Sequence, residues 1–276
     1  MYSLSDSSIK LKVMSFNMKR NMFSFGRHAW SKRASLVADV IRRNAPDILG
    51  TQELTEITLS DLQRLLPEYA FVGQGRDGEK RGEYSAIFYR KDRFTLLSQD
   101  TFWLSKTPGM PSRSWLALFP RICTWCELCP KDAPEKTVRV YNTHLDHVSY
   151  FARVNGLKLI CRQILERYQA APGPVVFMGD FNATPNSRTL RKWEEDNLAS
   201  QEKVMLRDSY NMLLKTSGPQ PLGCSYHGFK GRILGNPIDY IFTSRDVVLR
   251  AVAIERAKGE GSYPSDHYPV VAEMEL

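Results

Sequence analysis

The sequence has no hydrophobic run long enough to cross a membrane and no tract of low complexity. Its first residues, Met1 to Asp6, contain neither the basic segment nor the apolar segment of a secretory signal peptide. We therefore expect a cytoplasmic protein without a membrane-spanning segment. The chain also lacks the Gly-x-Ser-x-Gly elbow of serine hydrolases and the Gly-x-x-x-x-Gly-Lys loop that cradles phosphates. These absences argue against a serine nucleophile and against a nucleotide-binding loop of that kind.

Cysteine is scarce, with five residues in the chain and no spacing typical of a disulfide framework. Cys123, Cys126 and Cys129 have the spacing of some metal sites. They lie in a segment that reads as a β-strand, where Cys126 points to the opposite face from the other two. Three thiolates on opposite faces cannot converge on one ion. We therefore expect buried thiols and no zinc site.

The chain has 276 residues, of which 42% are hydrophobic and 25% charged, as in ordinary globular proteins. No domain linker is evident, so we expect a single domain over residues 1–276, with a short N-terminal extension at 1–10, and a monomer. The net charge of +8 favours a polyanionic partner such as DNA or RNA. However, the basic residues are scattered, so a soluble protein that is basic overall remains an alternative.

Hydrophobic periodicity predicts an α/β fold in which two packed mixed β-sheets are flanked by helices. Helices are predicted over 31–43, through Leu59 and Leu62 up to Pro67, from Val154 to Tyr168, and over 188–195. Strands are predicted over 12–17, 47–50, 69–72, 84–89, 94–103, 121–128, 137–144, 175–178, 238–243, 247–254 and 268–275.

The strand that follows Pro174 ends in a small polar signature, Gly179 to Asn182. With a side-chain period of two, Asp180 and Asn182 would share a face with apolar residues and emerge together where the strand ends. A carboxylate that orients water beside an amide donor suits hydrolytic chemistry. The alternative is a polar turn in which both side chains satisfy backbone groups.

Other apolar strands also end in residues that can bind a metal, move a proton or donate to an oxyanion. Asp239 is in the strand 238–243, on the same face as Ile241, where an unpaired charge would cost several kcal/mol. It therefore needs a partner, and a histidine is the natural one. The residues at strand ends are Asn17, Gln52, Glu53, Asn142, His144, Asp180, Asn182, Asp239, Asp266 and His267.

These motifs resemble those of the endonuclease/exonuclease/phosphatase superfamily of metal-dependent phosphoesterases, and a bacterial subgroup of it in particular. The matching segments occur in family order over nearly the whole chain: Ser15-Phe16-Asn17, Gln52-Glu53, Asn142-Thr143-His144-Leu145, Gly179-Asp180-Phe181-Asn182, Ile238-Asp239-Tyr240-Ile241 and Ser265-Asp266-His267. The resemblance implies a four-layer α/β sandwich and a divalent-metal-dependent phosphoester hydrolase.

The resemblance also implies a metal site. It makes Glu53 the main ligand, with Asn17 and Asp266 close to the cation or to the phosphate. Mg²⁺ is the expected ion, and Mn²⁺ is expected to substitute, because oxygen ligands and retained water suit these metals.

The catalytic residues implied by the resemblance are His144, Asp180, Asn182, Asp239 and His267. His267, held by Asp239, acts as base or polarises the phosphate, and Asp180 orients or deprotonates water. Asn182 donates to a non-bridging oxygen, while His144 protonates the leaving oxygen.

Three further residues are candidates for contact with substrate: Asn142, Glu83 and His227. Glu83 is expected to orient His144 or, alternatively, to be a solvated charge at a strand edge. His227 is expected to assist the reaction or, alternatively, to bond the backbone of a turn.

The sequence allows more than one hypothesis for the substrate. The first hypothesis is a phosphodiesterase or nuclease, favoured by the charge, with loop aromatics such as Trp103, Trp115 and Tyr226 available for base stacking. The alternative for the tryptophans is a place in the core. The second hypothesis is a phosphatase or phosphodiesterase of small or lipid-derived phosphoesters. A binding protein with an inactive site is disfavoured, because every expected catalytic position is present.

Overall fold

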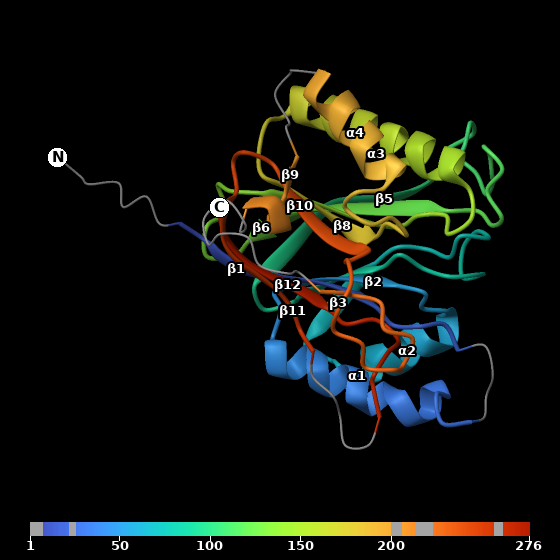
Figure 1. Cartoon of the computed structure of the whole chain (residues 1–276). Helices are drawn as coiled ribbons and strands as arrows, with labels where there is room; N and C mark the ends of the chain where they lie inside the picture. Colours follow the sequence, from blue (N-terminus) through green and yellow to red (C-terminus); the bar gives the residue numbers. More distant parts are fainter. Residues whose placement is uncertain (1–7, 22–25, 200–205, 213–222, 257–261) are drawn as a thin grey trace.

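A computed structural model describes residues 8–21, 26–199, 206–212, 223–256 and 262–276. Within these ranges the strands form two six-stranded sheets that face each other (Figure 1). The first sheet has the order β11-β12-β1-β2-β4-β3, formed by Val248–Ile254, Val270–Glu275, Lys10–Asn17, Ile48–Gln52, Ile87–Arg90 and Tyr69–Val72. The second has the order β5-β6-β7-β8-β10-β9, formed by Phe94–Trp103, Ile122–Pro130, Val138–His144, Val175–Asp180, Asp239–Thr243 and Arg207–Asp208.

Both sheets are mixed, because one central pair of strands in each is parallel and the other pairs are antiparallel. The parallel pairs are β1 with β2 and β7 with β8. The four long helices cover the outer faces (Figure 1). Helices α1 (Trp30–Asn44) and α2 (Glu56–Leu65) lie on the first sheet, and α3 (Tyr150–Ala170) and α4 (Arg188–Ala199) lie on the second. The predicted four-layer α/β sandwich is therefore confirmed.

The helices form where the apolar spacing predicts them. In α3, Leu157, Ile160 and Ile164 are buried in the core with the second sheet, three to four residues apart. The helix begins at Ser149, whose side-chain oxygen accepts a hydrogen bond from the backbone N–H of Ala152. No helix in the described ranges is long and apolar enough to cross a membrane.

Some boundaries differ from the sequence prediction. Strand β4 begins at Ile87 and not at Tyr84, because Tyr84 makes isolated bridges to Leu54 and Gly75 instead of a ladder. The two-residue strand β9 was not predicted. Of the expected extension 1–10, residues 1–7 lie outside the described residues. Ile9 donates a backbone hydrogen bond to Leu276, and Lys10 opens β1.

Two of the three cysteines of β6 are buried, as predicted, and Cys129 is only partly buried. Cys123 and Cys126 are fully buried in the core between β6 and its neighbours, and neither forms a disulfide. Among the described residues, no cluster suited to a metal ion includes a cysteine. Trp103 is also a core residue, since it is buried and its indole N–H donates to the backbone oxygen of Arg76.

Candidate active site

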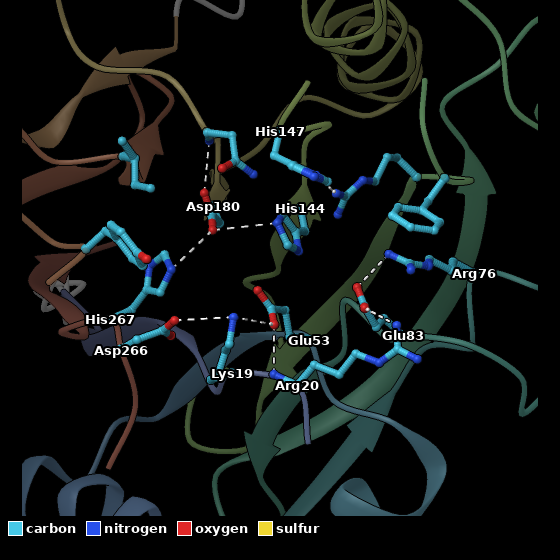
Figure 2. A pocket seen from close by; sticks show the side chains of 15 residues that line it. Lys19, Arg20, Glu53, Arg76, Glu83, His144, His147, Asp180, Asp266 and His267 are labelled. Atoms are coloured by element: carbon cyan, nitrogen blue, oxygen red, sulfur yellow. Dashed lines mark hydrogen bonds and ion pairs between the residues drawn. The ribbon is translucent and has the colours of Figure 1, made fainter. Parts of the chain in front are cut away.

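The ends of strands from both sheets surround a cavity of about 440 Å³. Figure 2 shows the side chains that line it. Those predicted from the sequence are Glu53, Glu83, His144, Asp180, Asn182, Asp266 and His267. Asn17 and Asp239 lie directly behind them and hydrogen-bond to Glu53 and His267, respectively. Residues up to 250 positions apart thus meet in one site.

His267 is held between two buried carboxylates. Its Nδ1 atom lies 2.9 Å from Oδ2 of Asp239, and its Nε2 atom lies 3.8 Å from Oδ2 of Asp180. Asp239 and Asp180 are direct partners across the antiparallel pair β10 and β8. The burial of Asp239 led us to expect a histidine partner, and the structure provides one.

The protonation states follow from these contacts. Burial alone would lower the pKa of His267, but the charge and hydrogen bond of Asp239, with Asp180 and Asp266 nearby, raise it to about 10. Burial, reinforced by the charge of Asp239, raises the pKa of Asp180 to about 7. These contacts therefore favour the imidazolium form of His267, and they make Asp180 hold a proton more readily than an ordinary carboxyl group.

His144 lies on the other side of Asp180. Its Nε2 atom is 3.6 Å from Oδ2 of Asp180, and the two residues are neighbours in the parallel pair β7 and β8. Gly179 makes this approach possible, because a Cβ atom there would lie 2.0 Å from the backbone oxygen of Thr143. Burial and the charge of Arg121 hold the pKa of His144 well below its usual range, so the ring is neutral.

A second group of charges lies opposite the histidines (Figure 2). The Lys19 ammonium lies 3.3 Å from Oδ2 of Asp266 and 4.0 Å from Oε2 of Glu53. The Asn17 amide nitrogen donates to Oε1 of Glu53 at 3.1 Å and to Oδ2 of Asp180 at 2.9 Å. Although burial opposes it, the charge of Lys19 holds the pKa of Glu53 below its usual range. Glu53 is thus an ionised carboxylate.

These residues suit a divalent cation. Glu53 and Asp266 are two largely buried carboxylates that share one ammonium. A positive charge between them therefore already stabilises their negative charges. Carboxylate oxygens are also the donors that Mg²⁺ prefers. The Asn17 amide donates hydrogen bonds to Glu53 and to Asp180, so it orients these two carboxylates.

A different cluster, Asp180, Asp239 and His267, also has ligand atoms within 4.8 Å of one another. Of these three residues, Asp239 does not line the cavity, and its Oδ2 is engaged with Nδ1 of His267. Glu53 and Asp266 both line the cavity. We therefore expect the cation beside Glu53 and Asp266.

Asn182 lies just beyond β8, in the left-handed conformation with φ of 48°. Because the strand ends at Asp180, the alternation that we assumed for Asn182 does not continue this far. Its backbone N–H donates to Oδ1 of Asp180, and its amide nitrogen donates to the backbone oxygen of Leu145. Asn182 thus lines the cavity and bonds a backbone carbonyl, as the polar-turn alternative expects, while its role in the reaction stays a prediction.

The prediction that Asn142 contacts substrate is wrong. Its side chain is fully buried between the two sheets and does not line the cavity. Its Nδ2 donates to the backbone oxygens of Thr51 and Ala86, and its Oδ1 accepts from Gln52. A Cβ atom on Gly50 would lie 2.9 Å from the Asn142 oxygen, so glycine permits this contact. Asn142 therefore joins the sheets.

Glu83 lines the cavity but does not orient His144 as we expected. Its two oxygens accept hydrogen bonds from Arg20 and Arg76, because both guanidinium groups lie on its side of the cavity.

His227 does not line the cavity. It is buried, stacks on Tyr268 and accepts a hydrogen bond from the backbone N–H of Gly231. The alternative of a turn histidine bonded to backbone is therefore the one observed.

Several lining residues were not found from the sequence: Lys19, Arg20, Arg121 and His147. A search for carboxylates, amides and imidazoles at strand ends passes over cations. The position of Lys19, two residues beyond the end of β1, was the available signal. Of the aromatic candidates, Tyr226 lines the cavity, and its ring centroid lies 5.0 Å from that of His267.

The model of the Endonuclease/Exonuclease/phosphatase family matches residues 14–267. The chain belongs to this family. Among curated relatives it is 26% identical to 2',5'-phosphodiesterase 12 of Bos taurus, over 88% of this chain and 45% of the relative. The chain thus spans under half the length of that protein.

Solved structures of this family cover the whole fold. A mannosyl-6-phosphatase of Bacteroides thetaiotaomicron VPI-5482 is 30% identical, with a TM-score of 0.83, over 96% of this chain and 99% of that chain. A family member from Bacteroides vulgatus is 31% identical, with a TM-score of 0.84, over 97% of this chain and 99% of that chain. As a family member, the protein is assigned to the phosphoester hydrolases.

Proposed function

We propose that the protein is a divalent-metal-dependent hydrolase in which water attacks the phosphorus of a phosphoester directly. The observation that carries this proposal is the division of the cavity. The carboxylates Glu53 and Asp266 stand on one side, and the chain Asp239, His267 and Asp180 stands on the other. A phosphate between them would meet positive charge on one side and acid–base groups on the other.

In the proposed reaction Asp180 accepts the proton of the attacking water, since its raised pKa suits a base near neutral pH. His267, kept protonated by Asp239, donates a hydrogen bond to a non-bridging phosphate oxygen. Asn182 has a second amide N–H besides the one given to Leu145, and this donor would face another phosphate oxygen.

His144 would serve the leaving oxygen. In the free protein the ring is neutral because of burial and the nearby guanidinium of Arg121. The negative charge of a bound phosphate would offset that guanidinium and raise the pKa of His144, which would let the ring donate a proton.

Glu53 and Asp266 would hold the cation, with Asn17 orienting the Glu53 carboxylate. When bound, Mg²⁺ or Mn²⁺ would neutralise phosphate charge and polarise the phosphorus. Lys19 already lies between the two carboxylates and would have to move aside or turn toward the phosphate.

We favour a small phosphoester as substrate. A relative matched over its whole length at 30% identity is a mannosyl-6-phosphatase, and the cavity volume suits a compact ligand. The second candidate is a nuclease or other phosphodiesterase, favoured by the net charge of +8 and by the likeness to 2',5'-phosphodiesterase 12. We further expect a cytoplasmic monomer, which cell fractionation and size-exclusion chromatography would test.

An activity panel tests the proposal. Purified protein is assayed with Mg²⁺, with Mn²⁺ and with EDTA, on sugar phosphates, inositol phosphates, a nitrophenyl phosphodiester, single-stranded DNA, duplex DNA and RNA. We expect metal-dependent turnover of at least one class, and turnover lower by about 10²- to 10⁴-fold in His267→Ala. Full turnover after exhaustive chelation would refute the mechanism.

A further inference from the structure

Two arginines to which the proposed mechanism gives no contact with the substrate lie beside His144. Arg76 and Arg121 both line the cavity, and each is only 5% exposed. Figure 2 shows Arg76 on the side of the cavity away from His267. Both arginines help to lower the pKa of His144, so both guanidinium charges lie close to that ring.

The local carboxylates are already engaged. Asp146 lies 3.8 Å from Nε of Arg121, but its oxygens accept three backbone hydrogen bonds, from Leu118, Val148 and Ser149. Glu83 divides its two oxygens between Arg76 and Arg20.

Buried donors are therefore left over. Arg121 donates one side-chain hydrogen bond, from Nη2 to Nδ1 of His147 at 3.0 Å, out of five possible N–H donors. The Nε atoms of Arg76 and Arg121 are buried and have no hydrogen-bond partner among the described residues. These Nε atoms are closed to the cavity, so a ligand would be bound by the terminal guanidinium nitrogens, of which Arg121 uses one for His147.

The charges of the two arginines also favour a bound anion. Burial and the nearby charge of Arg76 lower the pKa of Arg121, which means that the two guanidinium groups repel each other. Arg20, Arg76 and Arg121 line this end of the cavity with one carboxylate, Glu83. Asp146, which does not line the cavity, and Asp180 also act on Arg121. An anion placed between the arginines would remove the repulsion.

The aromatic neighbours hold this arrangement in place. The guanidinium carbon of Arg76 lies 4.6 Å from the centroid of the Phe119 ring, and the Phe119 ring stacks on His147 at 6.4 Å. His147 in turn contacts Arg121. Arg76, Phe119, His147 and Arg121 thus form a continuous, pre-organised wall.

We infer that Arg76, Arg121 and His147 form an anion subsite that binds a second negatively charged group of the substrate, on the His144 side of the scissile phosphate. This inference rests on the proposed function for the position of that phosphate. Guanidinium groups match phosphate and carboxylate oxygens with paired N–H donors. The substrate class is therefore a phosphoester that carries another phosphate or a carboxylate. A monophosphate of an otherwise uncharged sugar is the poorer substrate.

Matched substrates test the subsite. Initial rates with Mg²⁺ are compared for fructose 1,6-bisphosphate and fructose 6-phosphate, and for adenosine 3',5'-bisphosphate and 5'-AMP. We expect kcat/KM to be about 10- to 100-fold higher for the compounds with two phosphates, as expected for hydrogen bonds to a charged group. Arg121→Met and Arg76→Met should raise KM for these compounds and abolish most of the preference. Arg43→Met, on the exposed side of α1, is the matched control.

A binding measurement separates this inference from the proposed function. Titration calorimetry in EDTA measures inorganic pyrophosphate binding to the wild-type protein and to the same three variants, with circular dichroism as a check of folding. We expect binding that weakens about tenfold or more in Arg121→Met and Arg76→Met and is unchanged in Arg43→Met. If no compound is hydrolysed but this pattern holds, the subsite stands and the proposed reaction fails. Equal pyrophosphate binding by wild type and both cavity variants overturns the subsite, whatever the activity.

Discussion

The Nδ1 atom of His267 lies 2.9 Å from Oδ2 of Asp239, although the two residues are 28 positions apart. His267 comes from the loop before β12 in the first sheet, and Asp239 opens β10 in the second. Both side chains are at least 95% buried, so the pair is shielded from water. The contact fixes the orientation of the His267 ring and favours the protonated form of the ring. The role of this pair in the reaction can therefore be measured with variants of either residue.

Removal of the imidazole is the first prediction. His267→Ala should lose about 10²- to 10⁴-fold in kcat, the usual effect of removing positioned acid–base help. Asp239→Asn should impair the same step. Because the two act as a unit, the double variant should lose little more than the worse single variant. Kinetics on the best substrate of the panel, with circular dichroism to verify folding, provide the measurement. Multiplying effects would mean that Asp239 is only a buried structural carboxylate.

The pH profile is the second prediction. Asp180, with its pKa raised to about 7, must lose its proton to act as a base, so kcat/KM should rise with pH through that region. His267, with its pKa raised to about 10, must keep its proton, so the rate should fall as pH approaches that value. Asp239→Asn removes the charge that raises the pKa of His267. The falling limb should therefore move to lower pH in this variant, and an unchanged limb would assign that limb to another group.

Lys19 provides the third prediction, because it holds the carboxylates that we expect to bind metal. In EDTA, Lys19→Met should have a lower melting temperature than wild type, since Glu53 and Asp266 lose their shared counter-ion. Mg²⁺ should stabilise this variant more than it stabilises wild type, because the competing ammonium is gone. Differential scanning calorimetry with and without Mg²⁺ measures both effects, with exposed Lys32→Met as control. Weaker Mg²⁺ stabilisation of Lys19→Met would show that Lys19 assists the cation.

The fourth prediction concerns the link between the sheets. Asn142→Ala removes three buried hydrogen bonds and leaves the Gln52 amide without its acceptor at position 142. The free energy of unfolding should fall by about 1–3 kcal/mol or more. Asn155→Ala removes one hydrogen bond at the surface of α3 and should change it by less than about 0.5 kcal/mol. Urea denaturation measures both, and equal effects would rule out a special role for Asn142.

Much of the site could be predicted because it follows strand ends. Glu53, Asp180 and His144 each come at or just after the last residue of an apolar strand, and strand ends are visible in a sequence. Asp239 could be paired with a histidine because a buried carboxylate is costly without a partner. These inferences need only local pattern and the energy of burying charge.

The remaining residues depend on tertiary contacts. Asn142 and His144 lie on the same face of β7, yet only His144 reaches the cavity, because β2 packs over Asn142. Arg121 precedes a strand in the same way as many surface arginines, and nothing local places it beside Arg76. The sheet order decides both outcomes, and periodicity does not reveal sheet order.

The two-residue spacing of Asn142 and His144 has a consequence for the fate of misfolded chains. If β7 paired with β8 in a register shifted by one residue, His144 would leave the cavity, and Asn142 would turn away from Gln52 at the same time. The shifted chain would then carry unpaired polar groups between its sheets and would open more often. Chains that lack a correctly placed His144 would therefore be the ones that cellular proteases degrade first, so that quality control of folding also selects for an intact site.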